Sequence, residues 1–168
     1  MLTSLKIENV AIIESAAIEF GCGLNVLTGE TGAGKSIVID SINAILGERT
    51  SRDIIRTGAQ SAKVYAVFED VNERVRNFLD ENGIDCEDGV LIINRTLSRE
   101  GKNVCRINGA PVTVSMLREI GGELIDIHGQ HDNQSLLSPE KHCGFVDSFA
   151  GNSDLIADYR KKYGRLCE

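Results

Sequence analysis

A glycine-rich segment of eight residues constrains this chain more than any other feature. Gly29-Glu-Thr-Gly-Ala-Gly-Lys-Ser36 matches the pattern G-x-x-x-x-G-K-[ST] at every fixed position. An apolar segment that we predict as a strand, residues 24–27, precedes it, and a predicted helix over residues 35–46 follows it. Glycines let backbone N–H groups converge on phosphate oxygens, and the start of a helix adds the positive end of its dipole. The segment therefore predicts a phosphate-binding loop in an α/β fold.

The loop also predicts which side chains bind the nucleotide. We expect Lys35 to reach the β- and γ-phosphates and the Ser36 hydroxyl to ligate Mg²⁺. This pattern specifies that a nucleotide is bound, but it does not specify what happens to the γ-phosphate. The candidate nucleotide-binding residues are Gly29, Glu30, Thr31, Gly32, Ala33, Gly34, Lys35 and Ser36.

Several classes of P-loop protein stay open at this point. A GTPase is not indicated, because the chain has no N/T-K-x-D motif. A small kinase fits the length of 168 residues, with Asp126 or Asp40 as its base and arginines 49, 52 and 56 in a lid. A third possibility is a nucleotide-binding module that does not hydrolyse and whose C-terminal helix is its whole interaction site.

The remaining pattern indicates strands that precede and follow the loop, with helices between them. Alternation with period two predicts strands over residues 5–10, 11–20, 63–68, 90–97 and 103–107. Helices are predicted over residues 71–81, from Thr113 to Gly121-Gly122, and from Pro139 after the cap Ser138. Residues 123–127 are predicted as a short buried strand. From Asp154 the pattern is again helical, with heptad-like spacing of Ile156, Tyr159, Tyr163 and Leu166.

Several segments together resemble the structural-maintenance-of-chromosomes class of ATPases, in its bacterial DNA-repair branch. They are Ser4-Leu-Lys-Ile-Glu-Asn-Val-Ala-Ile-Ile-Glu, the segment from Gly23 to Ser36, Ile39-Asp-Ser-Ile, Gly47-Glu-Arg, Ile55-Arg-Thr-Gly, Arg106-Ile-Asn-Gly and Ile125-Asp-Ile-His-Gly-Gln-His. The resemblance implies an ABC-ATPase-like P-loop head, split by a long antiparallel coiled coil, of which this chain is the N-terminal half.

The fold class expected from this resemblance is α/β, a P-loop half-head with an antiparallel β subdomain. Residues 1–150 would form the N-terminal lobe with the Walker A loop and the Q-loop. Residues 151–168 would be the truncated start of a coiled-coil helix. Walker B, signature, catalytic glutamate and switch histidine would lie in the missing C-terminal half. We therefore expect weak ATP binding and hardly any hydrolysis by this chain alone.

The resemblance also assigns roles to single residues. Gln130 would be the Q-loop glutamine, close to Mg²⁺ and the attacking water, so that Lys35 and Gln130 act in catalysis and Ser36 and Gln130 bind the metal. Asp126 would then not be the Walker B aspartate, and Gly121-Gly-Glu123 would only mimic a signature motif. ATP and Mg²⁺ are the implied cofactors.

The implied function is the ATP-binding half of an ATPase in DNA double-strand break repair and recombination. Its implied partners are the C-terminal half of the same head, a second head in a homodimer, and DNA. No apolar stretch is long enough to cross a membrane, and no signal peptide is indicated, which predicts a cytoplasmic, nucleoid-associated protein.

Charge and cysteine content add weaker indications. The net charge of −7 argues against a chain that is basic all over, but residues 90–118 hold five basic residues and one acidic residue. That hairpin, with Arg95, Arg99, Lys102 and Arg106, and the pair Arg52 and Arg56 are candidate DNA contacts; the alternative is an ordinary solvated surface. A zinc site at His128, His131, His142 and Cys143 is a further alternative. The five cysteines form no CxxC pair and are expected to be reduced.

Overall fold

The computed structural model describes residues 1–29, 34–127 and 139–167. The chain divides into two compact units, Met1–Asp126 and Ile127–Glu168. None of the helices formed by the described residues is long and apolar enough to cross a membrane. The expected functional boundary at residue 150 stays a prediction, since the division into units concerns packing alone.

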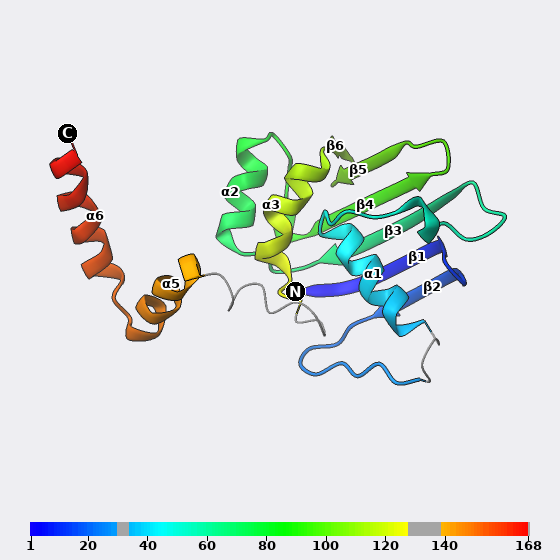
Figure 1. Cartoon of the computed structure of the whole chain (residues 1–168), viewed down its shortest axis with the longest axis horizontal. Coiled ribbons are helices and arrows are strands. Elements are labelled where there is room, and N and C mark those ends of the chain that lie inside the picture. Colours follow the sequence, from blue (N-terminus) through cyan, green and yellow to red (C-terminus); the bar gives the residue numbers. More distant parts are fainter. Residues whose placement is uncertain (30–33, 128–138, 168) are drawn as a thin grey trace. The chain divides into compact units, whose positions relative to one another are not determined.

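Unit Met1–Asp126 is built on one six-stranded sheet in the order β2-β1-β3-β4-β5-β6, and every neighbouring pair is antiparallel (Figure 1). Burial alternates along the central strands, so one face carries the core and the other is more exposed. The strands predicted over residues 5–10, 11–20, 63–68, 90–97 and 103–107 are thus confirmed, and β6 is a further strand. Their bounds are β1 Leu2–Val10, β2 Ile13–Glu19, β3 Ser61–Phe68, β4 Leu91–Ser98, β5 Asn103–Ile107 and β6 Ala110–Val112.

Three helices cover the core face of the sheet: α1 (Lys35–Ile45), α2 (Glu73–Glu81) and α3 (Val114–Leu124). The side chains of Asn72 and Thr113 accept hydrogen bonds from the first turns of α2 and α3, which explains where these helices begin. Short 3-10 turns occupy Arg52–Ile54 and Glu87–Gly89. The largest fully buried side chains, in the core between sheet and helices, are Phe68, Leu5, Ile7, Ile45, Leu79, Leu91, Ile93, Ile107, Leu117, Ile120, Val10 and Val75.

Two predicted strands are wrong, and both flank the expected site. Residues 24–27 form no regular element and are exposed, with Leu24 at 90% of its maximum. Helix α3 does not stop at Gly121-Gly122 but continues to Leu124, and residues 125–127 have no regular structure. A strand needs a hydrogen-bonding neighbour, and the described residues supply none to either segment.

One side of α1 is apolar, and the described residues cover only part of it. Val38, Ala44 and Ile45 are buried against the sheet, whereas Ile39 is 41% exposed. The helix therefore has an apolar face that the described residues leave partly open.

The described residues of unit Ile127–Glu168 form the helices α5 (Pro139–Ala150) and α6 (Ser153–Cys167). The predicted helical end of the chain is confirmed. On α6 the rings of Tyr159 and Tyr163 stack with centroids 6.0 Å apart, and both side chains are exposed, as is Leu166. The coiled coil suggested by their spacing stays a prediction.

Close packing of α3 on the end of α1 generates a stability test. A Cβ atom at Gly121 would lie 2.5 Å from the carbonyl oxygen of Leu46, whereas one at Gly122 would meet nothing within 4 Å. We expect Gly121→Ala to destabilise the fold by about 1–3 kcal/mol, because backbone must move. The matched control Gly122→Ala should stabilise it by up to about 1 kcal/mol through helix propensity. Urea unfolding of both variants measures this, and equal effects would contradict the packing.

Candidate functional site

The first turn of α1 forms the described part of the candidate site. Gly34 is its N-cap residue, with φ 96° and ψ −6°, in the left-handed region that favours glycine. No side chain of the described residues caps this helix start. Because the first N–H groups of a helix lack intrahelical acceptors and carry the positive end of its dipole, this position suits an anion such as a phosphate.

Lys35 and Ser36 follow directly in this turn. The Lys35 ammonium donates a hydrogen bond to the carbonyl oxygen of Gly29, so the lysine bridges the two ends of the glycine-rich segment. Ser36 is exposed at the helix start. An ammonium, a hydroxyl and helix-terminal amides form a donor set that fits phosphate oxygens, and a hydroxyl oxygen also fits Mg²⁺. Residues 30–33 of the predicted loop lie outside the described residues.

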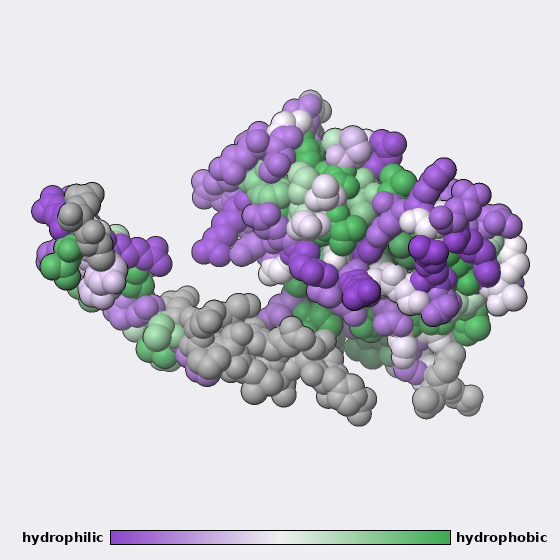
Figure 2. Space-filling model, turned by 45° about the horizontal axis from the view of Figure 1, so that its top comes forward, coloured by the Kyte–Doolittle hydropathy of each residue, from purple (hydrophilic) through white to green (hydrophobic). Residues whose placement is uncertain are grey.

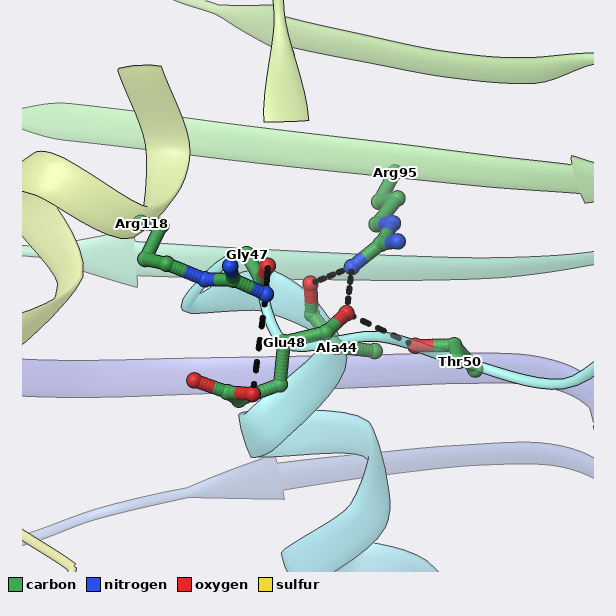
Figure 3. A network of polar contacts seen from close by, with 6 residues as sticks. All are labelled: Ala44, Gly47, Glu48, Thr50, Arg95 and Arg118. Atoms are coloured by element: carbon green, nitrogen blue, oxygen red, sulfur yellow. Dashed lines mark hydrogen bonds and ion pairs between the residues drawn. The ribbon is translucent and has the colours of Figure 1, made fainter. Parts of the chain in front are cut away.

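The opposite end of α1 is held by Arg95, a residue to which sequence reasoning assigned a different role. Its Nη1 donates hydrogen bonds to the carbonyl oxygens of Ala44 (2.5 Å) and Glu48 (2.8 Å), as Figure 3 shows. Its Nε donates to the Asn103 side chain at 3.2 Å. The carbonyl of Glu48 also accepts a bond from the Thr50 hydroxyl. The guanidinium thus occupies the negative end of the α1 dipole.

Burial gives Arg95 an unusual electrostatic position. It is 2% exposed and is the sole buried charged side chain in the part of the chain that the structure describes. Removal from water lowers the pKa of its guanidinium from the usual range, because burial disfavours the charged form. The alternation of Leu91, Ile93, Arg95 and Leu97 places it on the core face of β4. That alternation was the signal in the sequence that could have identified it.

The candidate DNA contacts differ in their surroundings: some of these side chains have partners within the chain and others are exposed. The prediction that Arg95 contacts DNA is wrong, since it lies in the core. Arg56 donates to the carbonyl oxygen of Ile12 at 3.0 Å and pairs with Glu14 at 3.5 Å, and Arg106 donates to the carbonyl of Gly109. Arg52 is exposed, and its guanidinium lies over Gly101 at the turn between β4 and β5. Two basic segments of the sequence therefore meet at one end of the sheet.

The other single-residue predictions are placed as follows. Gln130, His128 and His131 lie outside the described residues. Asp126 is exposed after the end of α3, and Asp40 is exposed on α1. His142 and Cys143 are exposed on α5, and across the residues that the structure describes no three His, Cys, Asp or Glu side chains are placed to hold a metal ion. The zinc alternative therefore gains no support from the described part.

Comparisons with known proteins place this geometry in a family context. A family model described as AAA domain matches residues 4–163. The DNA repair protein RecN of Bacillus subtilis is 45% identical over 98% of this chain, and RecN of Vibrio cholerae is 38% identical over 97%. The chain spans 29% of the length of each of these relatives. The resemblance inferred from the sequence, to RecN, is thus confirmed.

A solved structure shows the same fold. The Smc head domain with a coiled coil and joint from Pyrococcus yayanosii superposes with a TM-score of 0.69 at 20% identity, covering 98% of this chain and 35% of that one. The predicted α/β fold class, an ABC-ATPase-like P-loop fold with an antiparallel sheet and a C-terminal helix, is therefore confirmed, and its description as half of a head stays a prediction.

The left-handed conformation of Gly34 generates a test of the site. Gly34→Ala should destabilise the chain by about 1–2 kcal/mol from backbone strain alone, because the nearest atom to an added Cβ is 3.8 Å away. Gly58→Ala is the matched control, since Gly58 has a similar φ of 88° and open space around it. We expect similar melting temperatures for the two variants, but weaker MgATP binding by calorimetry for Gly34→Ala alone. Equal affinities would contradict the placement of the site.

Proposed function

Because this chain belongs to the AAA domain family, we propose that it is the ATP-binding N-terminal part of a RecN-like ATPase in DNA double-strand break repair and recombination. The observation that carries the proposal is the complete Walker A pattern at a glycine-started helix, in a chain similar to RecN over nearly its whole length. We assign the catalytic and DNA-linked activities to an intact protein that contains this chain, a proposal supported by the 29% of RecN length that the chain spans.

The proposed roles of the site residues follow their chemistry. Glycine-rich backbone from Gly29 to Gly34 cradles the phosphates, and Lys35 offsets negative charge on the β- and γ-phosphates. Ser36 offers its hydroxyl to Mg²⁺, whose chemistry when bound is to neutralise charge that develops on the γ-phosphate. Gln130 is proposed as the second side chain near the metal and the attacking water.

Exposed apolar residues next to the site support a missing half of the head. Leu24, Val26 and Leu27 precede the loop and are 44–90% exposed, and Ile39 is exposed on α1. Figure 2 shows such apolar residues at the surface of both units. Burial of this surface would favour association by about 25 cal/mol for each Å² removed from water. We propose that strands from the remaining part of the protein pair with residues 24–27 and cover them.

The second unit supports a partner of its own. On α6, Leu155, Tyr159, Tyr163 and Leu166 are exposed at 55–81%. The 3-4-3 spacing of Ile156, Tyr159, Tyr163 and Leu166 is typical of one strand of a coiled coil, where a facing helix would bury these side chains. We propose a returning helix of the same protein as that partner.

DNA and a second head complete the proposal. SMC ATPases with the same fold are described as undergoing ATP-driven dimerization and DNA-stimulated activation. In this chain, exposed Arg49 and Arg52 beside the β4–β5 turn with Lys102 offer cations to a phosphate backbone. We propose a homodimer of heads that binds DNA, in the cytoplasm at the nucleoid.

The Walker A lysine generates the test of this proposal. In the intact protein that contains this chain, Lys35→Ala should weaken MgATP binding by about 10-fold or more, because a point charge on the phosphates is lost. Isothermal titration calorimetry measures the affinity.

Lys162→Ala is the matched control, since Lys162 is an exposed lysine on α6 paired with Asp158 at 2.7 Å. It should bind MgATP as the unaltered protein does. Unchanged affinity in Lys35→Ala would overturn the site assignment. Transfer of the γ-phosphate to a small acceptor would instead favour the kinase alternative.

A further inference from the structure

We propose that Arg95 is a positioning residue for the nucleotide site, although it lies at the far end of α1 from Lys35 and Ser36. Its guanidinium fixes the C-terminal end of this helix on the sheet and so sets the direction in which the first turn points. The inference rests on the proposed ATP site and deepens it, since it names the residue that fixes the position of the Walker A helix, α1, on the sheet.

The contacts of Arg95 are specific to one end of one helix. Ala44 lies in the last turn of α1 and Glu48 lies just beyond it, and one guanidinium nitrogen bonds both carbonyl oxygens (Figure 3). The Ala44 carbonyl, in the last turn of the helix, also accepts the Gly47 amide at 3.2 Å, and the Glu48 carbonyl lies in the segment that follows the helix. The same side chain bonds Asn103 on β5, so one residue joins the helix end to two adjacent strands.

The register of the sheet explains why this charge points inward. Arg95 is paired with Val64 on β3 and Cys105 on β5, and both neighbours are buried. None of the ion pairs found among the described residues includes Arg95. Two backbone carbonyls and the side-chain amide of Asn103 therefore take the place of water around its charge. An apolar side chain would fill this place at a lower desolvation cost, but it would remove the Arg95 donor from both carbonyl oxygens and leave them the Gly47 amide and the Thr50 hydroxyl.

No other described side chain fixes the same helix end in this way. Arg118 reaches the Gly47 carbonyl at 3.3 Å and the Glu48 carboxylate at 3.8 Å, but its side chain is 58% exposed. A screened surface contact of this kind holds geometry weakly. Ser41 is buried, but its hydroxyl bonds the Ile37 carbonyl within α1 itself. The apolar face of α1 resists separation from the sheet, but apolar contact is not directional.

Because α1 is long, a small tilt of this helix would displace its first turn, at the candidate site. Eleven residues at about 1.5 Å each make α1 about 16 Å long. A rotation of about 4° around the apolar contacts at one end would therefore move the other end by about 1 Å. A misplacement of about 1 Å in a site costs on the order of 100-fold in rate. Arg95 restrains this rotation at the C-terminal end of α1, opposite the candidate site.

The test compares two substitutions of Arg95 in the intact protein. Arg95→Met keeps the volume and removes the donors, so we expect the KM for ATP to rise about 10-fold at a temperature well below the melting transition of the variant. Arg95→Lys keeps one cationic donor. We therefore expect the logarithm of its KM for ATP to rise by at most half as much as in Arg95→Met. Steady-state ATP hydrolysis and MgATP calorimetry provide the two readouts.

Controls separate positioning from a general loss of stability. Val75→Ala removes buried volume from α2, far along the sequence from α1, and should lower the melting temperature with no change in KM for ATP. Arg118→Met removes a cation at the same turn and should change KM less than twofold. Folded Arg95→Met with unchanged KM, or a KM that rises as much in Val75→Ala as in Arg95→Met, would overturn the inference. If the unaltered protein binds no ATP, the proposed function fails instead.

Discussion

The docking of α1 on the antiparallel sheet is the constraint on which the rest of the structure depends. Its two ends are held by different chemistry. At the start, Gly34 takes a left-handed conformation that turns the backbone into the helix, and Lys35 closes over Gly29. At the finish, a buried guanidinium from β4 bonds two carbonyls. Between them, one apolar face packs on the sheet. At the proposed phosphate site, this docking would fix the direction in which the first turn of α1 points.

The same docking leaves much apolar surface open. Helices cover one face of the sheet, and α3 approaches the end of α1 so closely that Gly121 contacts the Leu46 carbonyl. Yet Leu24, Val26 and Ile39, all near the phosphate-binding turn, are exposed. Exposed apolar residues gathered beside a site are typical of an interface. This chain spans 29% of the length of the RecN relative from Bacillus subtilis, and the completion of the head by further sequence is our proposal.

Local patterns were sufficient to predict most of the fold, and long-range pairing explains what they missed. Alternation predicted β1, β3, β4 and β5, because one face of each strand is buried by helices. The cap residue Thr113 predicted the start of α3 for the same local reason, whereas Asn72, which caps α2, was not identified from the sequence. Residues 24–27 have the composition of a strand but no neighbour among the described residues, so composition alone misled. Arg95 was assigned to the surface because a charge usually is solvated, although the alternation of β4 placed it inward. The glycine-rich pattern could be recognised because its residues are contiguous in sequence, whereas Arg95, which bonds the far end of α1, is 60 residues from Lys35 by number.

The central claim is that this chain is one part of a split ATPase head. Measuring ATP hydrolysis by the chain alone, and after mixing with the separately produced remainder of the intact protein, tests it most directly, each with and without DNA. The account predicts hardly any turnover by the chain alone and clear turnover on mixing. Steady turnover by the chain alone would contradict it, because the chain would then be a self-sufficient P-loop enzyme.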